Sequence, residues 1–532
     1  MKFRWPFGNK DKPAEKKGKR IYGGAMFNRL TNDWNASIGT SQDSETRSSL
    51  RTLRNRTRQL ARDNDWIRNA LRAIQNNVVG TGVGMQMQVK MARKRNGKVM
   101  NQSVNEAIED AWEQWCKASN CHTAGLLNFS DIERLLISSC AENGEVLVRI
   151  VKGTAFGTSP VPMALEVIES DQLMDERNGT EDNGNIIRMG VEKNEWGRPV
   201  AYWFYPYHPG DYLFKTVVLS KYKRVPADEV IHLYKHERPG QTRGIPWFAS
   251  ALQRMHQVAG FEEAEVVAAR ASASIMGFIT TPDGELQDDG VQANQRVSDF
   301  SPGKIEALGP GETFTAFTPT RPGGQYDPFV RAQLRAVAAG VGVSYETLSK
   351  DYSQSNYSSS RLALLDDRDQ WRALQSWFIK NFHQRVFEEW LDMAVLSGAL
   401  DLPNYEVNPD AYRAVRWMPR GWSWVDPAKE VAAYKEAVRC GFMTQAEVVS
   451  QTGCDIEELM MQRQREVEMA ESMGLVFDTN TAEVNDKGQV QPAPAPDAAA
   501  EEADAGDAAD DAAAAPAEDD ASEGTETSSD AT

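Results

Sequence analysis

Cysteine and histidine are scarce in this chain, and their scarcity limits the chemistry that it can carry. Its 532 residues include five Cys and six His. An odd number of scattered Cys predicts free thiols in a reducing compartment, because a disulfide framework needs pairs. Cys116 and Cys121 lie close together, but neither a second pair nor a His at ligand spacing completes a zinc site. We therefore expect neither a metal ion nor a cofactor.

The sequence also lacks the common signatures of enzymes. It contains no GxxxxGK[ST] phosphate-binding loop, no GxSxG turn and no HExxH pair. His232 and His236 lie four residues apart, but His232 falls in a strand pattern, where that spacing does not make a helical metal pair. Glu166 and Glu169 are interpreted as structural rather than as a paired acid and base. The chain is therefore predicted not to be an enzyme. The alternatives are an α/β enzyme without a recognisable motif and a DNA-binding structural protein.

Long apolar runs are missing, and charge is spread unevenly. No run approaches the roughly 18–20 apolar residues of a membrane span, and the N-terminus lacks the apolar core of a secretory signal. The net charge is −17, yet the first 20 residues carry eight Lys or Arg against two acids. After Lys487 there are 13 acids and no base. The acidic tail is too poor in large apolar residues to fold and is expected to be disordered. The basic arm either binds nucleic acid or is a flexible solubilising terminus.

Helical patterns dominate the first part of the body. Leu53, Leu60, Ile67 and Ile74 recur every seven residues, which predicts a helix with one apolar stripe. A second helix is expected from about residue 104 to 119, with two Trp in the core. The first helix also carries many Arg, which either face phosphate groups or form ion pairs with acidic neighbours. These are Arg51, Arg54, Arg56, Arg58, Arg62, Arg68 and Arg72.

Short β-branched and aromatic runs follow between residues 144 and 233. They are EVLVRIV, ALEVIES, IIRMGVEK, PVAYWFY and VIHLY, separated by turn residues, and they predict a mixed or antiparallel sheet with a hairpin turn at Gly197. A helix with Pro246 near its first turn is expected next, continuing through an Ala-rich stretch. A turn-rich excursion with short strands at KIEAL and TFTAF then separates it from another helix. The fold class is therefore expected to be α+β.

The most distinctive stretch runs from Ala338 to Leu364, AAGVGVSYETLSKDYSQSNYSSSRLAL. It lies between two helical patterns, and it is rich in Ser, Tyr, Asn and Gln. Neutral hydrogen-bonding groups and amphipathic rings suit weak, non-specific contact with a ligand that moves past. Many Lys and Arg would instead hold nucleic acid through counterion release. The alternative is an ordered surface connection.

Six pieces of the sequence stand in a specific order and spacing. They are SLRTLRNRTRQLARDNDWIRNALRAIQNNVVGTG, ALEVIESDQL, GVEKNEWGRPVAYW, HLYKHERPGQTRGIPWFASALQRM, AAGVGVSYETLSKDYSQSNYSSSRLALLDDRDQWR and GWSWVDPAKEVAAYKEAV. Together they resemble the lambda-type phage portal proteins, from about Arg20 to Glu468. The resemblance implies an α+β portal fold that closes into a ring and has long helices and a small mixed β region.

The resemblance also implies the parts of the chain. They are a basic flexible arm (1–25), a wing of helices and a β-rich part (26–243), a first stem helix (244–279), a clip (280–325), a second stem helix (326–342), a tunnel loop (343–360), a long wing helix (361–402), a crown (403–480) and a disordered acidic tail (481–532). The tunnel loop is expected to face DNA through Ser344, Tyr345, Lys350, Tyr352, Gln354, Asn356, Tyr357 and Arg361. The clip is expected to dock partners through Asp283, Glu285, Asp288 and Asp289.

The function that the resemblance implies is structural. Such rings, usually of twelve copies, lie at one capsid vertex, where double-stranded DNA is packaged and ejected. The expected partners are further copies of the chain, DNA without sequence preference, the large terminase subunit, a head-completion or adaptor protein, and a major capsid or scaffold protein. No membrane is expected to be involved. The expected location is the virion, after assembly in the host cytoplasm.

Overall fold

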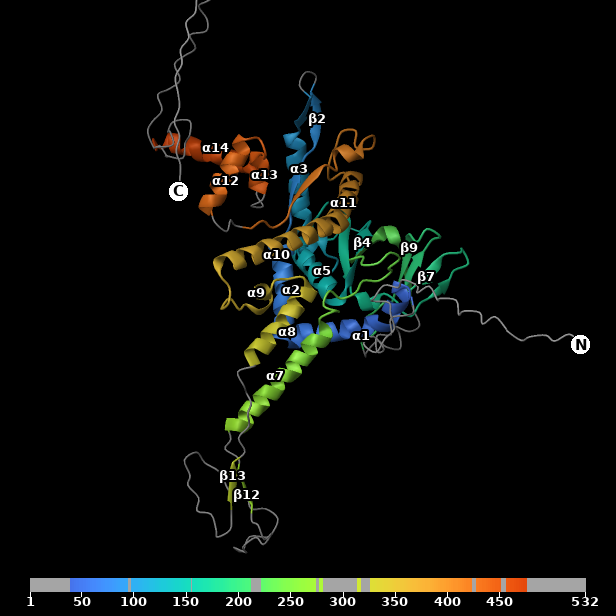
Figure 1. Ribbon diagram of the computed structural model, residues 1–532. Helices are drawn as coiled ribbons and strands as arrows, with labels where there is room; N and C mark the ends of the chain where they lie inside the picture. Colours follow the sequence, from blue (N-terminus) through green and yellow to red (C-terminus); the bar gives the residue numbers. More distant parts are fainter. Residues whose placement is uncertain are drawn as a thin grey trace, which may run out of the picture. The chain divides into compact units, whose positions relative to one another are not determined.

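The structure is a computed structural model that describes residues 39–93, 97–154, 156–211, 222–273, 277–280, 313–316, 326–422, 427–450 and 456–475. The chain divides into two compact units, Met1–Ile456 and Glu457–Thr532. The first unit combines helices with antiparallel strands, as expected for an α+β fold (Figure 1). No helix in the described ranges has both the length and the apolar character needed to cross a membrane.

Two helices, α1 (Gln42–Asp63) and α2 (Asp65–Val78), carry the apolar heptad pattern that predicted a single helix. The break lies at Asn64, whose backbone is extended, with φ −116° and ψ 122°. The Asn64 side chain caps α2 by accepting a hydrogen bond from the N–H of Ile67 at 3.0 Å. The prediction of one helix was wrong. Asn64 ends α1 and caps α2, and because no residue is inserted there, the apolar side chains keep the same spacing across the break.

Antiparallel strands form two larger sheets at the positions predicted for the β-rich part. The first has three strands, in the order β11 (Val230–Tyr234), β4 (Glu145–Lys152), β5 (Met163–Ile168). The second has five strands, in the order β10 (Lys223–Pro226), β9 (Pro199–Phe204), β8 (Val191–Lys193), β7 (Ile186–Arg188), β6 (Gly179–Thr180). The predicted hairpin turn joins β8 to β9, and Gly197 takes the left-handed conformation there (φ +75°).

An aromatic core joins α3 (Gln102–Trp115), α5 (Phe129–Asn143) and α11 (Gln384–Leu396). Trp112 lies edge-on to Trp390, with 5.0 Å between ring centroids, and Trp115 is fully buried. The core placement predicted for both Trp residues is confirmed. A short helix, α4 (Ala118–Cys121), follows α3. Cys116, Cys121, Cys140 and Cys440 are free thiols.

The helix expected from residue 244 to 279 is shorter in the structure. Helix α7 spans Leu252–Ala273, and strand β12 (Gly277–Thr280) follows it. The preceding segment, 245–251, forms turns in which the N–H of Ala249 donates to Pro246 and that of Ala251 donates to Phe248. The N–H of Trp247 donates to Ala141 of α5 at 3.0 Å. Strand β12 pairs with β13 (Thr313–Ala316), which confirms the strand predicted in TFTAF, whereas KIEAL lies outside the described residues.

The remaining elements follow the predicted order, with three changes. Helix α8 spans Tyr326–Val341, and the short helix α9 (Tyr345–Ser349) lies within the segment predicted to be a loop. The long helix is α10 (Tyr357–Phe378), a π-helical turn (Ile379–His383) and α11. Strand β14 (Val415–Met418) pairs with β1 (Gly84–Met87), so the start of the predicted crown joins the body. Strands β2 (Lys90–Arg93) and β3 (Gly97–Met100) form a hairpin, and helices α12 (Pro427–Arg439), α13 (Gln445–Ser450) and α14 (Ile456–Ser472) end the described chain.

Candidate functional site

The 343–360 segment is fixed at its base by a buried carboxylate. Asp367 of α10 accepts the backbone N–H of Ser344 at 2.7 Å and the hydroxyl of Thr347 at 2.6 Å. The Ser344 hydroxyl also donates to Asp367 at 2.7 Å and caps α9 by accepting from the N–H of Thr347. Three hydrogen bonds thus converge on one side chain, and Asp367 holds the beginning of the segment against α10.

A second carboxylate holds the middle of the segment. Asp351 accepts the backbone N–H of Ser353 at 3.0 Å and the Tyr345 hydroxyl at 2.9 Å, and Arg331 of α8 lies 3.6 Å from it. Hydrogen bonds from Ser353, followed by the one from Tyr345, lower the pKa of Asp351 to about 2. The negative charge of Asp351 therefore interacts with the Tyr345 hydroxyl and with Arg331. Lys350 is its neighbour in the sequence.

Two further contacts order the segment. The side-chain amide of Asn69 in α2 donates to the carbonyl groups of Thr347 and Leu348, both at 2.8 Å, and Leu348 is fully buried. At the other end, Asn356 and Ser359 form a reciprocal capping box that begins α10. The segment is thus a short helix and a turn with anchored ends rather than an unstructured loop.

The sequence-predicted DNA-facing residues fall into two groups in the structure. Ser344, Tyr345 and Arg361 are engaged with the fold, and Arg361 pairs with Glu430 of α12 at 3.4 Å. The other five are exposed, although Asn356 also caps α10, and 57% of Tyr352 and 59% of Tyr357 are accessible to solvent. The exposed residues are Lys350, Tyr352, Gln354, Asn356 and Tyr357. The exposed surface therefore carries one fixed charge, that of Lys350, among polar and aromatic groups.

Helices α7 and α8 pack against each other in antiparallel fashion, and α8 also contacts α9 of this segment (Figure 1). Phe261 of α7 contacts Phe329 of α8, with 4.6 Å between ring centroids, and Arg254 donates to Gln333 at 2.6 Å. Val266 and Val267, further along α7, are exposed. The two helices therefore contact each other along one face, and α7 exposes apolar side chains elsewhere on its surface.

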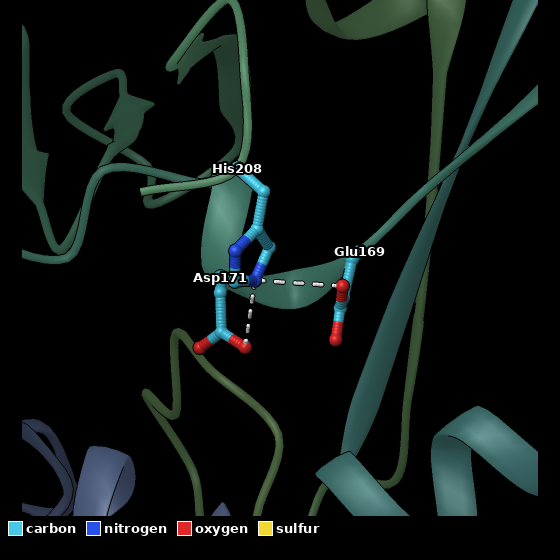
Figure 2. A group of neighbouring side chains, drawn as sticks. All are labelled: Glu169, Asp171 and His208. Atoms are coloured by element: carbon cyan, nitrogen blue, oxygen red, sulfur yellow. Dashed lines mark ion pairs between the residues drawn. The ribbon is translucent and has the colours of Figure 1, made fainter. Parts of the chain in front are cut away.

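Acidic partners surround one face of α1. Figure 2 shows Glu169, Asp171 and His208, which lie close enough to one another to resemble a metal-binding group. The Nε2 atom of His208 lies 3.5 Å from Glu169 and 3.7 Å from Asp171. The guanidinium of Arg58 pairs with both carboxylates, at 2.9 Å from Glu169. Because Arg58 already supplies positive charge there, the group is a network of ion pairs on the protein surface.

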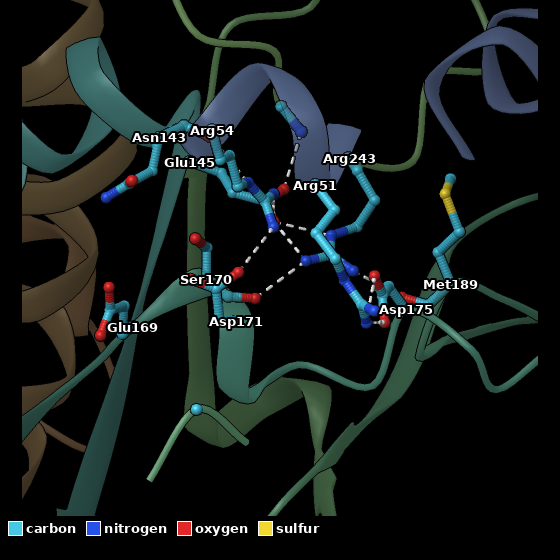
Figure 3. Close-up of polar contacts among 12 residues, drawn as sticks. Arg51, Arg54, Asn143, Glu145, Glu169, Ser170, Asp171, Asp175, Met189 and Arg243 are labelled. Atoms are coloured by element: carbon cyan, nitrogen blue, oxygen red, sulfur yellow. Dashed lines mark hydrogen bonds and ion pairs between the residues drawn. The ribbon is translucent and has the colours of Figure 1, made fainter. Parts of the chain in front are cut away.

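A fully buried carboxylate lies next to this network. Figure 3 shows Arg54 of α1 and Arg243 converging on Glu145, the first residue of β4. The guanidinium of Arg54 lies 2.5 Å from the carboxylate and that of Arg243 lies 2.6 Å from it, while His232 lies 2.9 Å away. The N–H of Gly244 also donates to Glu145 at 2.7 Å. Glu145 therefore ties α1, β11 and the segment before α7 to β4.

The charge states in this cluster follow from burial and from the two guanidinium groups. Burial opposes ionisation of Glu145, but Arg243 and Arg54 outweigh it and hold its pKa well below 4.5. Burial lowers the pKa of His232 below 6.5, although Glu145 acts in the opposite direction. Neutral His232 therefore donates its Nε2 proton to Glu145.

The sequence left two interpretations of the Arg-rich helix open, phosphate contact and ion pairing with acidic neighbours. Ion pairing is confirmed for Arg51, Arg54 and Arg58.

Sequence reasoning missed the residues that position the candidate site. Asp367 lies four residues before Trp371 on the face of α10 that Leu374 and Phe378 bury, so helical spacing could have indicated it. No local signal marks Asn69 or Arg331, because both act on residues distant in the sequence. The expected clip residues Asp283, Glu285, Asp288 and Asp289 lie outside the described residues, as do the basic arm and the acidic tail.

Comparison with known proteins identifies the family. The profile described as phage portal protein, lambda family, matches residues 27–375. A probable portal protein of Halomonas phage phiHAP-1 is 30% identical over 465 residues, covering 86% of this chain and 88% of that protein. Portal protein B of Escherichia phage lambda is 23% identical over 483 residues, covering 85% and 90%. A chain from the neck of a native gene transfer agent particle covers 79% of this chain and 96% of its own length, at 14% identity and a TM-score of 0.42. The chain belongs to the lambda family of phage portal proteins.

Proposed function

We propose that this chain forms a closed ring at one vertex of a phage capsid and that double-stranded DNA passes through the ring during packaging and ejection. The observation that carries the proposal is the 343–360 segment of this portal-family chain. Its beginning is anchored by Asp367 and Asn69 and its end by the Asn356–Ser359 capping box, while its exposed residues are mostly neutral. In this proposal the segment faces the channel, and the ring is made of about a dozen copies.

The charges of the segment suit a surface past which DNA slides. Lys350 is its exposed cation, whereas Arg361 pairs with Glu430, and Arg331 in α8 pairs with both Asp351 and Asp327. Each phosphate that a protein neutralises adds affinity and releases a counterion. A surface with few unpaired cations therefore holds the backbone weakly. Tyr352 and Tyr357 add flat, exposed groups that contact DNA without fixing its position.

The α7–α8 pair supplies a surface for neighbouring copies. Val266 and Val267 are exposed on α7, and the small side chain of Ala268 follows them. Exposed apolar groups on a helix beside small residues favour close packing against another helix. We assign α7 and α8 to the stem of the ring, with the body before them as the wing and helices α12 to α14 as the crown.

The proposed partners follow from this location. They are the large terminase subunit during packaging, a head-completion or adaptor protein afterwards, and the major capsid or scaffold protein around the ring. The clip between α7 and α8 is the proposed docking part. Assembly takes place in the host cytoplasm in this proposal, and the mature location is the capsid vertex. No catalytic step is assigned to the chain.

The test adds positive charge to the exposed part of the segment and leaves Asp367, Asn69 and the Asn356–Ser359 capping box unchanged. The variant Ser353→Lys with Gln354→Lys introduces two cations, and Ser353→Asn with Gln354→Asn is the neutral control. Each Lys that contacts a phosphate steepens the log–log salt dependence of DNA binding by about 0.9. We expect slower packaging in vitro at low salt for the Lys variant and an unchanged rate for the control. Packaging at the unmodified rate by both variants would show that the segment does not face DNA.

A further inference from the structure

The hairpin between β8 and β9 presents an unusually exposed tryptophan. Trp196 lies at its tip with 85% of its surface accessible to solvent. The side chain of Asn194 accepts the N–H of Trp196 at 3.0 Å and that of Arg198 at 2.9 Å, and the N–H of Gly197 donates to the carbonyl of Asn194 at 2.9 Å. The tip is therefore held in one conformation. A rigid, exposed Trp is the residue type most often found as the anchor of a protein interface.

The same chain contains a cavity of matching character. It has a volume of about 430 Å³ and lies between the end of α3, the turn at 81–84 and the start of α5. Its apolar walls are Val83, Trp112 and Phe129, and the hydroxyl oxygen of Ser130 offers an acceptor for an indole N–H. The Glu133 carboxylate at its base is buried and already held by His383 and by the N–H of Val83. Aromatic rings pack favourably edge-to-face, as Trp112 and Phe129 already do with 5.2 Å between centroids.

Charges beside the two features are complementary. The tip carries exposed Glu195 and Arg198 on either side of Trp196, and neither forms an ion pair within the ranges that the structure describes. The cavity is lined in turn by exposed Glu113 and Lys117. Glu195 can therefore face Lys117 while Arg198 faces Glu113. The hairpin tip of one copy and the cavity of the next would form a head-to-tail contact with opposite charges facing each other. Such a contact generates a ring when the rotation from one copy to the next closes on itself.

We propose that Trp196 of one copy inserts into the cavity lined by Trp112 and Phe129 of the next copy. This inference rests on the proposed ring and adds to it a contact outside the α7–α8 pair. Every subunit gives one hairpin and receives one, so each contact is repeated around the ring.

The first test compares ring assembly of full-length variants by light scattering over a range of concentrations. Trp196→Ala is expected to raise the concentration at the midpoint of assembly at least tenfold, because hot-spot residues contribute that much or more. Leu396→Ala, at an exposed position with 80% accessibility, is the control and should leave assembly unchanged. Reversing both tip charges (Glu195→Lys with Arg198→Glu) should weaken assembly. Reversing Glu113 and Lys117 as well should restore it. Rings of unchanged stability in Trp196→Ala would overturn the inference.

The second test places one cysteine on each side of the contact. Lys117 is exposed and lines the cavity, so the thiols introduced by Trp196→Cys and Lys117→Cys should be joined between neighbouring copies by a short bismaleimide cross-linker. Denaturing gels should show a ladder of chain multiples for the double variant that Trp196→Cys alone does not give. A ladder from Trp196→Cys alone, or no ladder from intact rings of the double variant, contradicts the contact. If the unmodified chain forms no rings at all, the proposed function fails, whereas unmodified rings with no ladder refute only this contact.

Discussion

Glu145 is the shared partner of two buried guanidinium groups in the first unit. Removing its charge would leave Arg54 and Arg243 buried without their shared partner. Breaking a buried ion pair from one side costs about 3–5 kcal/mol. We expect Glu145→Gln to lower the free energy of unfolding by that amount in urea titrations. Arg51→Gln is the control, because Arg51 pairs with Asp175 and Glu176 at the surface and should contribute less than about 1 kcal/mol. Equal effects of the two variants would refute this ranking.

The same cluster predicts how stability responds to acid. The pKa of His232 is lowered in the folded chain, so the unfolded chain binds the proton more readily below pH 6.5. The pKa of Glu145 is also lowered in the folded chain. Its contribution to the free energy of unfolding is therefore present above pH 4.5 and is lost as the pH falls further. Stability should therefore decrease from about pH 6.5 downward, with the His232 contribution lost first.

The variant His232→Gln isolates that first step. Gln keeps a hydrogen-bond donor toward Glu145 but does not titrate. We expect thermal unfolding temperatures of the unmodified chain to fall between pH 7 and pH 5 more steeply than those of the variant. The groups around His232 are Glu145, Arg54 and Arg243, with Tyr202 and Tyr234 packed against its ring. Parallel pH profiles for the two proteins would show that His232 does not titrate in this range.

At the scale of elements, the predicted strands were found because their sequence signals are local. Runs such as EVLVRIV and PVAYWFY are rich in β-branched and aromatic residues and end at turn residues, and each corresponds to a strand. The break at Asn64 and the turns at 245–251 were missed for the opposite reason. At the first, the Asn64 side chain caps α2 without changing the apolar spacing, and at the second, the hydrogen bond from Trp247 to Ala141 joins distant parts of the chain.

The long-range contacts of the Glu145 cluster and of the candidate site were hidden from the sequence, because the sequence does not show which distant groups meet. Arg54 meets Glu145 from 91 residues away, and Arg243 meets it from 98 residues away. Asp367 reaches Ser344 across 23 residues. The polar character of the 343–360 segment was visible in its composition, but which of its residues serve the fold and which face solvent depends on these contacts.

Helix α7 is the element whose surface the ring proposal tests most simply. If neighbouring stems pack closely, a large side chain at Ala268 cannot be accommodated. We expect Ala268→Trp to yield subunits or small oligomers in size exclusion with light scattering, and Val267→Asp to do the same by placing a charge in an apolar contact. Glu263→Gln, an exposed position on the same helix, should assemble normally. Normal rings from both Ala268→Trp and Val267→Asp would show that α7 does not lie in the interface between copies.

For the whole molecule, the acidic tail is predicted to be dispensable for assembly. Residues 492–532 carry many acids, no Lys or Arg and no large apolar side chain. A segment of this composition cannot bury enough apolar surface to offset the entropy of ordering. A chain ending at Gln491 should therefore form rings like the full chain, and limited proteolysis should remove the tail first. Loss of rings on truncation, or a tail that resists proteases, would contradict the prediction.

The central claim is that this portal-family chain closes into a ring with the 343–360 segment on the channel wall. Electron microscopy of the purified full-length protein tests both parts in one measurement. We predict closed rings of about a dozen copies, near 0.7 MDa, with density for α9 and the start of α10 facing the central opening. Monomers or small open oligomers, or rings that carry Tyr352 and Tyr357 on their outer surface, would contradict the claim.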